Sequence, residues 1–118
     1  MYSSAKEFFG SRKERARAIR DNAPAVGKAF ATLEMGLMAD GAISAKNKEL
    51  IALGIGMADH CLPCIRAHVS ACLEEGATRE EIMEAAGVAV VMAGGPAFIH
   101  IPAVVEALDE LEAMKADK

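Results

Sequence analysis

Residues that favour the α-helix dominate this sequence, and they restrict its fold more than any other feature does. Alanine occupies 24 of the 118 positions, tryptophan is absent, and only five residues are aromatic. Alanine, leucine, methionine, glutamate, lysine and arginine are the strongest helix formers, whereas β-branched runs are confined to residues 87–91 and 99–105. We therefore expect an all-α fold in which small side chains let helices approach closely and methionine fills the gaps.

Capping and helix-breaking residues divide the chain into six expected helices. Ser44 can cap a helix start, Gly76 suits a helix end, and Thr78-Arg79-Glu80-Glu81 has the spacing of a capping box. Gly94-Gly95-Pro96 breaks the chain again, and Pro102 is expected to kink or split the last helix. The expected helices cover, in order, residues 4–20, 24–38, 45–58, 61–75, 78–93, and the segment from the Gly94-Gly95-Pro96 break to residue 114.

Apolar positions indicate which parts of these helices are buried. Residues 50–58 carry no charge, so their helix is expected to be buried all round. Residues 85–105 also carry no charge and are long enough to span a bilayer, but the glycine and proline breaks divide them, so we expect buried helices instead. Other expected anchors are Phe8, Phe9 and Ile19 in the first helix and the helically spaced stripe Val26, Phe30, Leu33 and Leu37 in the second.

Size and charge narrow the choice of partners. A chain of 118 residues suits one domain, residues 1–118, and it carries more apolar helix than such a domain can enclose. We therefore expect a homo-oligomer that buries the surplus. The net charge is −4 with no basic block, which predicts neither a nucleic-acid nor a membrane partner. No secretion signal is visible, so a cytoplasmic location is expected.

The segment Cys61-Leu62-Pro63-Cys64 is the clearest indication of chemistry. Proline is tolerated in the first turn of a helix, which places Cys61 at the N-cap and Cys64 in the first turn. Free N–H groups and the helix dipole stabilise a thiolate there. We expect these two cysteines to form an intrachain disulfide on mild oxidation, because Cys72 lies too far along the helix to reach either.

A histidine and a carboxylate are expected beside the thiols. His68 follows Cys64 by four residues and so lies on the same helix face, where it can exchange a proton with the thiol. Glu49 belongs to the preceding helix, and an antiparallel hairpin of the two helices can bring it beside His68. The helix terminus favours Cys61 as the attacking thiol, whereas the His68 spacing favours Cys64. We adopt Cys64.

Several alternatives compete with a redox site. Cys61, Cys64 and His68 could together hold a zinc ion, although helix geometry keeps Cys72 out of that site because Cys61 and Cys72 would lie roughly 16 Å apart. The cysteines could be incidental core thiols, as we expect for Cys72. His60 and His100 suit a polar loop and a packed or interface position. We favour a redox pair with no metal and no organic cofactor.

Four segments together resemble the alkylhydroperoxidase AhpD-like branch of the carboxymuconolactone decarboxylase family. They are residues 48–53 (KELIAL), 61–68 (CLPCIRAH), 75–82 (EGATREEI) and 94–97 (GGPA). The resemblance implies an all-α, six-helix fold assembled as a trimer or hexamer. It also implies hydroperoxide reduction, with Cys64 attacking, Cys61 resolving, and His68 and Glu49 relaying protons. The best-known branch has a histidine directly before the second cysteine, where this sequence has Pro63.

Three functions therefore follow from the sequence. The first is a cysteine-dependent hydroperoxide or disulfide reductase, whose partners are a hydroperoxide and a dithiol or protein reductant. The second is a redox-sensing module without catalysis, in which the disulfide changes subunit packing. The third is a decarboxylase- or isomerase-type enzyme on the same scaffold, which is less expected because decarboxylating members generally lack the cysteine pair.

Overall fold

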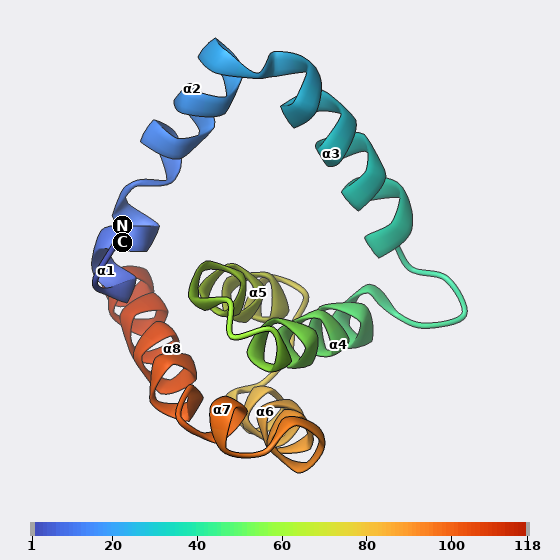
Figure 1. Ribbon diagram of the computed structural model, residues 1–118, viewed down its shortest axis with the longest axis vertical. Coiled ribbons are helices and arrows are strands. Elements are labelled where there is room, and N and C mark those ends of the chain that lie inside the picture. Colours follow the sequence, from blue (N-terminus) through green and yellow to red (C-terminus); the bar gives the residue numbers. More distant parts are fainter. Residues whose placement is uncertain (1, 118) are drawn as a thin grey trace.

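The protein is all-helical, as the composition predicts. The computed structural model describes residues 2–117, and these contain eight α-helices and no strand. Figure 1 shows them as a closely packed body and a long arm that arches away from it. The helices are α1 (Ala5–Gly10), α2 (Arg12–Asn22), α3 (Pro24–Met38), α4 (Ala45–Ala58), α5 (Leu62–Glu74), α6 (Arg79–Ala93), α7 (Gly95–Phe98) and α8 (Ile101–Ala116).

The body is built around the antiparallel pair α4 and α5. Helix α6 packs against α4, α8 packs against α5, and α1 closes the end of the body against α8 and α5. Their facing sides form one continuous apolar core. Its largest fully buried side chains are Leu53, Met57, Ile65, Val69, Cys72, Ile82, Val104 and Leu108. Phe8 and Phe9 are buried as predicted and fasten α1 to this core.

The expected first helix is interrupted at Ser11. In a continuous helix the carbonyl of Phe8 would accept a hydrogen bond from the amide of Arg12. Instead it accepts bonds from the Ser11 amide at 3.2 Å, from the Ser11 hydroxyl at 2.8 Å and from the Arg15 guanidinium at 2.8 Å. The prediction of one helix over residues 4–20 is therefore wrong at this point, because side chains compete for a backbone acceptor.

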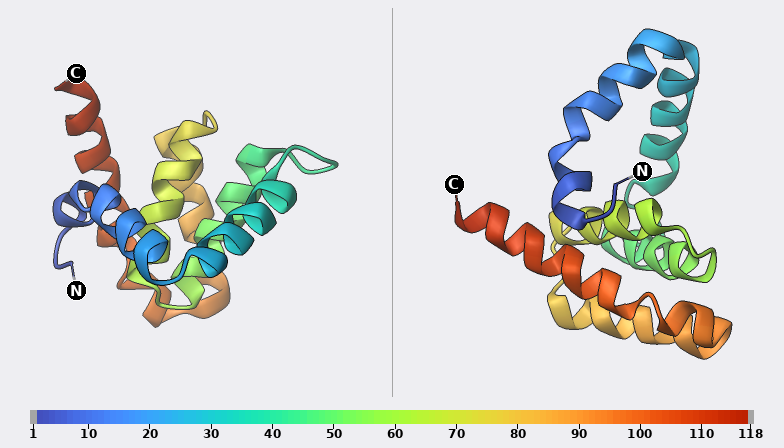
Figure 2. Two further views of the ribbon diagram at one scale, coloured as in Figure 1. Left: turned by 90° about the horizontal axis from the view of Figure 1, so that it is seen from above. Right: turned by 60° about the vertical axis from the view of Figure 1, so that its left-hand side comes forward.

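Helices α2 and α3 form the arm. Neither contains a buried residue, and Figure 2 shows both standing clear of the body. Ile19 packs against Gly27 of α3 rather than against the core, since a β-carbon on Gly27 would lie 2.7 Å from Ile19 Cγ2. The radius of gyration is 14.5 Å, above the roughly 13.5 Å expected for a compact chain of this length.

Local signals predicted most helix ends. Ser44 caps α4 through its hydroxyl, and Thr78 and Glu81 form both bonds of the capping box of α6. Gly76 has φ +89°, a left-handed conformation that glycine adopts without strain. The uncharged residues 85–105 are divided among α6, α7 and α8, as the proline and glycine breaks predict. No helix among residues 2–117 combines the length and the apolar character needed to cross a bilayer.

The apolar helices are covered on one side only. Helix α4 buries Leu53 and Met57, yet Ile51 and Ile55 of the same helix are more than half exposed. The expectation that this helix is buried all round is therefore not met within one chain, because α5 and α6 cover only two of its faces. The apolar stripe expected on α3 is also exposed: Val26, Phe30, Leu33 and Leu37 all remain open.

Candidate functional site

The turn between α4 and α5 positions the thiol motif. His60 has φ +55°, an unusual left-handed value for a residue with a side chain, and it reverses the chain in a tight turn. The amide of Cys61 then donates a hydrogen bond to the carbonyl of Gly56 at 3.0 Å. This bond ties the start of α5 to the last turn of α4.

Cys61 and Cys64 are joined as a disulfide, as the sequence predicts. Cys61 is the N-cap of α5, and its sulfur accepts a hydrogen bond from the Cys64 amide at 3.2 Å. Pro63 occupies the first turn, where no intrahelical partner is lost. In the reduced protein, the same free amides and helix dipole would favour a thiolate over a thiol.

Glu49 and His68 are in direct contact across the α4–α5 pair. Glu49 Oε2 lies 2.8 Å from Nδ1 of His68, and Glu49 is only 8% exposed. A carboxylate so deeply buried needs a partner, and His68 provides it. When Glu49 is ionised it accepts a hydrogen bond from Nδ1–H of His68, which leaves Nε2 of the imidazole as the nitrogen available to a reacting group.

Cys64 and His68 line the same cavity, whereas Cys61 and Glu49 lie outside its lining. The cavity has a volume of about 560 Å³ and extends from α5 toward the arm. Cys64 and His68 therefore face the same cavity. Glu49 contacts His68 and Cys61 is bonded to Cys64, but neither of these two partners lines the cavity. This arrangement favours Cys64 over Cys61 as the attacking thiol.

The third cysteine lies outside this chemistry. Cys72 is a free thiol with no exposed surface. Burial, together with a smaller contribution from the negative charge of Glu49, raises its pKa to about 12. A thiol with so high a pKa stays protonated and unreactive near neutral pH. Cys72 is thus the core thiol that the sequence indicates.

Sequence reasoning did not identify the other residues of the cavity wall as part of the site. Arg66 is 3% exposed, donates to the carbonyl of Tyr2 at 3.0 Å, and lies 3.5 Å from Glu106, while its Nε atom has no hydrogen-bond partner. Arg15, Phe30 and Glu34 reach the cavity from the arm. Arg66 is only two residues beyond the thiol motif and could have been suspected from the sequence, but no spacing rule connects α5 to the arm.

The remaining histidines form a separate pair. The rings of His60 and His100 are stacked with their centroids 5.9 Å apart, and Nδ1 of His100 lies 2.7 Å from the carbonyl oxygen of Pro96. Neither ring lines the thiol cavity. Across residues 2–117, no three His, Cys, Asp or Glu side chains are grouped in a way that could hold a metal ion.

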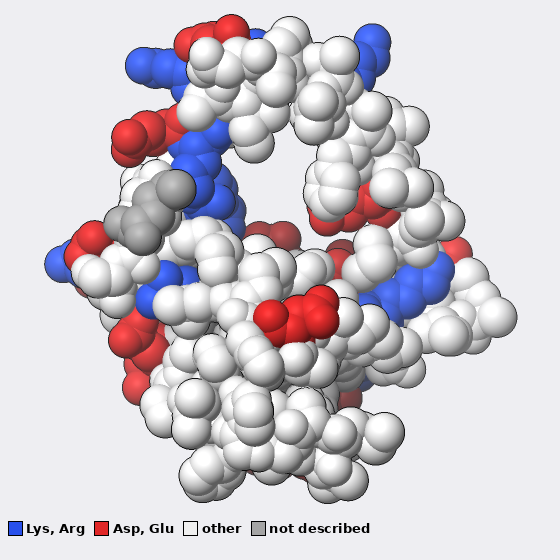
Figure 3. Space-filling view, in the orientation of Figure 1, with Lys and Arg blue, Asp and Glu red and all other residues white. Residues whose placement is uncertain are grey.

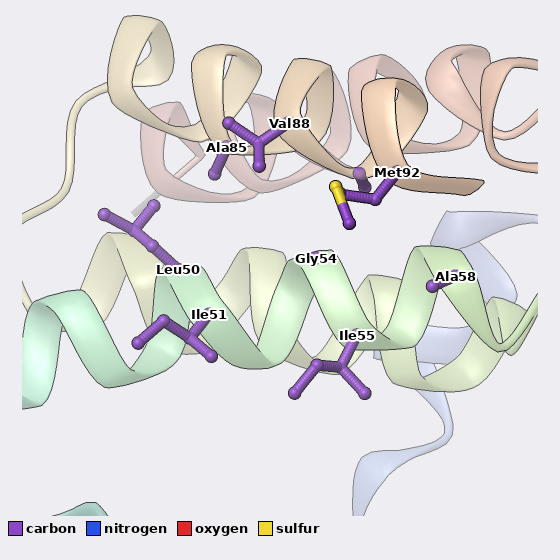
Figure 4. Close-up of a pocket in the computed structure, with 9 residues that line it drawn as sticks. Leu50, Ile51, Gly54, Ile55, Ala58, Ala85, Val88 and Met92 are labelled. Carbon is purple, nitrogen blue, oxygen red and sulfur yellow. The ribbon is translucent and has the colours of Figure 1, made fainter. Parts of the chain in front are cut away.

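A second hollow lies between α4 and α6 and has a different character. Its volume is about 400 Å³, and its walls contain only apolar residues and one glycine. Figure 4 shows the lining residues on two neighbouring helices, with Leu50, Ile51 and Ile55 on α4 and Val88 and Met92 on α6. It contains no group that could act as an acid, a base or a nucleophile, so we place the candidate site at the thiol cavity.

Comparison with known proteins agrees with this geometry. The family model described as "Carboxymuconolactone decarboxylase family" matches residues 24–107, which include both helices of the thiol hairpin. The chain belongs to the carboxymuconolactone decarboxylase family. The family assignment suggested by the four sequence segments is thereby confirmed, and so is the all-α fold class.

Proteins similar to this chain include one from Paracoccus denitrificans and others with solved structures. "Uncharacterized protein 4 in cox locus" of Paracoccus denitrificans is 39% identical over 87 residues, which cover 74% of this chain and 78% of that protein. A carboxymuconolactone decarboxylase family protein from Legionella pneumophila has a crystal structure that matches with a TM-score of 0.82 and 32% identity, covering 90% of this chain and 95% of that one.

A structure from Thermotoga maritima adds a functional suggestion. This family protein matches with a TM-score of 0.71 and 34% identity, covering 80% of this chain and 97% of that one. It is described as a candidate for involvement in an antioxidative response. That description concerns the Thermotoga protein, and it is compatible with redox chemistry at a cysteine pair.

Proposed function

We propose that this protein is a thiol-dependent hydroperoxide reductase that uses Cys61 and Cys64 as its redox pair. The observation that supports this most directly is the 2.8 Å contact between His68 Nδ1 and Glu49 Oε2 beside the Cys61–Cys64 disulfide. A base held by a buried carboxylate, next to a thiol at a helix start, is the arrangement that activates a nucleophilic cysteine.

The first step is attack of the Cys64 thiolate on the hydroperoxide. A sulfur–oxygen bond forms, the peroxide O–O bond breaks, and the substrate leaves as an alcohol once its oxygen gains a proton. The products are a Cys64 sulfenic acid and the alcohol. His68 takes the thiol proton and returns it to the leaving oxygen, while Glu49 stabilises the imidazolium that forms in between.

The second step closes the disulfide, which is the state present in this structure. The Cys61 thiol attacks the Cys64 sulfenic acid, a sulfur–sulfur bond forms, and water leaves. An external dithiol or protein reductant then exchanges with the disulfide, is itself oxidised, and restores both thiols. The cycle requires no metal or organic cofactor, and it suits a reducing compartment such as the cytoplasm.

Peroxide consumption with a dithiol reductant tests this proposal. The wild-type protein is expected to consume tert-butyl hydroperoxide over many turnovers, and Cys64→Ser is expected to abolish that activity. Cys72→Ser is the matched control, because it removes a buried thiol outside the redox pair and is expected to retain turnover. Oxidation that stops after one equivalent and changes the mass of the assembly would instead support the redox sensor.

A further inference from the structure

We infer that the thiol cavity selects hydroperoxides that combine an apolar chain with a carboxylate, and that Arg15 binds the carboxylate. This inference rests on the proposed function, and it names the substrate class for the same site. A long-chain fatty-acid hydroperoxide is the simplest molecule of this kind. The argument depends on the size of the cavity, the character of its walls and the distribution of charge around it.

The cavity is too large and too apolar for hydrogen peroxide alone. Its volume of about 560 Å³ lies within the range of roughly 300–1,000 Å³ typical of sites for organic ligands. Most of the wall beside the reactive end is apolar. The apolar lining residues are Tyr2, Phe8, Phe30, Leu62, Pro63 and Ala67, and the reactive end is formed by Cys64 and His68.

Arg15 carries a positive charge that this chain leaves unbalanced at the cavity wall. Its guanidinium stacks over the Phe8 ring at 3.8 Å, Nε donates to the Ser11 hydroxyl at 3.0 Å, and one terminal nitrogen donates to the Phe8 carbonyl at 2.8 Å. All three partners are neutral. Within residues 2–117, no carboxylate pairs with Arg15. The guanidinium is thus held in place with donors left over for an anion.

Arg66, the other arginine in the wall, is already engaged. It is almost completely buried, and it contacts both the Glu106 carboxylate and the Tyr2 carbonyl. Its charge adds to the positive potential of the cavity, but both terminal nitrogens already contact an acceptor, and its unpaired Nε atom is buried. Arg15 is therefore the residue with free capacity to bind a carboxylate directly.

The charges are arranged in a way that orients such a ligand. Figure 3 shows Lys and Arg atoms along the α1–α2 side of the opening between arm and body, and Asp and Glu atoms near the end of α3. Glu34 of α3 belongs to the cavity wall on that side. A ligand carboxylate is repelled by Glu34 and attracted by Arg15, so its apolar chain is left to run along Phe30 and Phe8 toward Cys64.

The test compares a fatty-acid hydroperoxide with its own methyl ester, both below the concentration at which micelles form. The wild-type protein is expected to show a kcat/KM about tenfold higher for the acid, mainly through a lower KM, because a partly exposed charge-assisted contact is being lost in the ester. Raising the salt concentration should reduce this preference, since salt screens exposed charges.

Variants of α2 assign the effect to one residue. Arg15→Gln is expected to remove the preference for the acid, and Arg15→Lys to keep part of it. The matched control is Arg17→Gln, which makes the same charge change on the same helix outside the cavity wall and should leave the preference intact. Unfolding of every variant in urea shows that the fold survives, and turnover of the small neutral tert-butyl hydroperoxide by Arg17→Gln shows that the thiol chemistry survives the loss of one charge from α2.

The outcomes separate the two proposals. Equal kcat/KM values for acid and ester in the wild-type protein, with normal turnover of tert-butyl hydroperoxide, would overturn the substrate assignment alone. A preference that survives in Arg15→Gln would likewise overturn the role of Arg15. No turnover of any hydroperoxide would overturn the proposed function, and this inference would fall with it.

Discussion

Gly56 of α4 and Cys64 of α5 approach so closely that a β-carbon on the glycine would lie 3.2 Å from Cβ of the cysteine. The same β-carbon would lie 3.6 Å from backbone atoms of Cys64 and Ile65. Because the carbonyl of Gly56 also accepts the Cys61 amide, this one glycine contacts both ends of the redox motif. Because Gly56 has no side chain, α4 can pack closely against the start of α5, which carries the two cysteines.

Replacing Gly56 by alanine is expected to destabilise the protein by about 1–3 kcal/mol, because the added methyl group presses on Cβ of Cys64. Gly54→Ala is the matched control, since its β-carbon meets nothing within 4 Å and alanine favours the helix by up to about 1 kcal/mol. Urea unfolding of both variants measures the difference. Equal or greater stability in Gly56→Ala would show that α5 can shift at no cost.

Removing either member of the proton relay is expected to slow oxidation of Cys64 by peroxide. His68→Ala removes the base, and Glu49→Gln removes the charge that orients it, so each should lower the rate by about 10²–10⁴-fold. Stopped-flow oxidation of the reduced protein measures this step apart from reductant turnover. His100→Ala changes a histidine outside the cavity and should be neutral, whereas unchanged rates in both relay variants would exclude the relay.

The exposed apolar faces are expected to be covered by further copies of this chain. Three apolar surfaces have no partner within residues 2–117: the groove between α4 and α6, the exposed residues Val26, Leu33 and Leu37 of α3, and Val91, which is 82% exposed. Light scattering at micromolar concentration should give the mass of a trimer or a hexamer. Val91→Asp should weaken assembly about tenfold or more, while Lys13→Asp on α2 should not. A stable folded monomer would contradict the prediction.

The ion pair between Lys46 and Glu81 is expected to make stability depend on acid pH. The hydrogen bond from Lys46 lowers the pKa of Glu81 below its usual 4.5, and the Thr78 amide lowers it further. A lowered folded-state pKa contributes stability that is present above the unfolded pKa and is lost as the pH falls through the folded value.

Unfolding in urea between about pH 3 and pH 7 measures this linkage. The wild-type protein should lose more stability on acidification than Glu81→Gln, which keeps the capping hydrogen bond but not the charge. Glu84→Gln serves as the control, because Glu84 is an exposed carboxyl of the same helix without an ion pair in residues 2–117. Identical pH profiles for wild type and Glu81→Gln would contradict the prediction.

Sequence reasoning grouped the residues of the candidate site because their relationships are local. The spacing of Cys61, Cys64 and His68 along one helix determines which side chains share a face, and a short turn brings Glu49 into range. The arm could not be predicted in this way. Its direction depends on Ser11, whose hydroxyl competes for a backbone carbonyl, and on Ala23, whose φ of −147° and ψ of 56° separate α2 from α3.

The residues of the cavity walls could not be predicted for the same reason, because they depend on contacts between segments that are distant in the sequence. Arg66 can be buried only because Tyr2 and Glu106, which are distant in the sequence, provide acceptors for it. The position of Arg15 above Phe8 likewise depends on the break between α1 and α2. Periodicity predicts which face of a helix is apolar, but it does not predict which distant segment will meet that face.

The buried thiol of Cys72 can be used to measure local unfolding of the protein around α5. A maleimide or iodoacetamide reagent reaches this thiol only when α5 separates from its neighbours, because the side chain has no exposed surface in the folded chain. Its alkylation rate, followed by mass spectrometry, therefore measures how often the native structure opens around this residue. Labelling of Cys61 and Cys64 in the same sample depends on whether their disulfide is reduced. One alkylation experiment thus measures two properties by mass spectrometry: labelling of Cys72 reports local unfolding, and labelling of Cys61 and Cys64 reports the redox state of the disulfide.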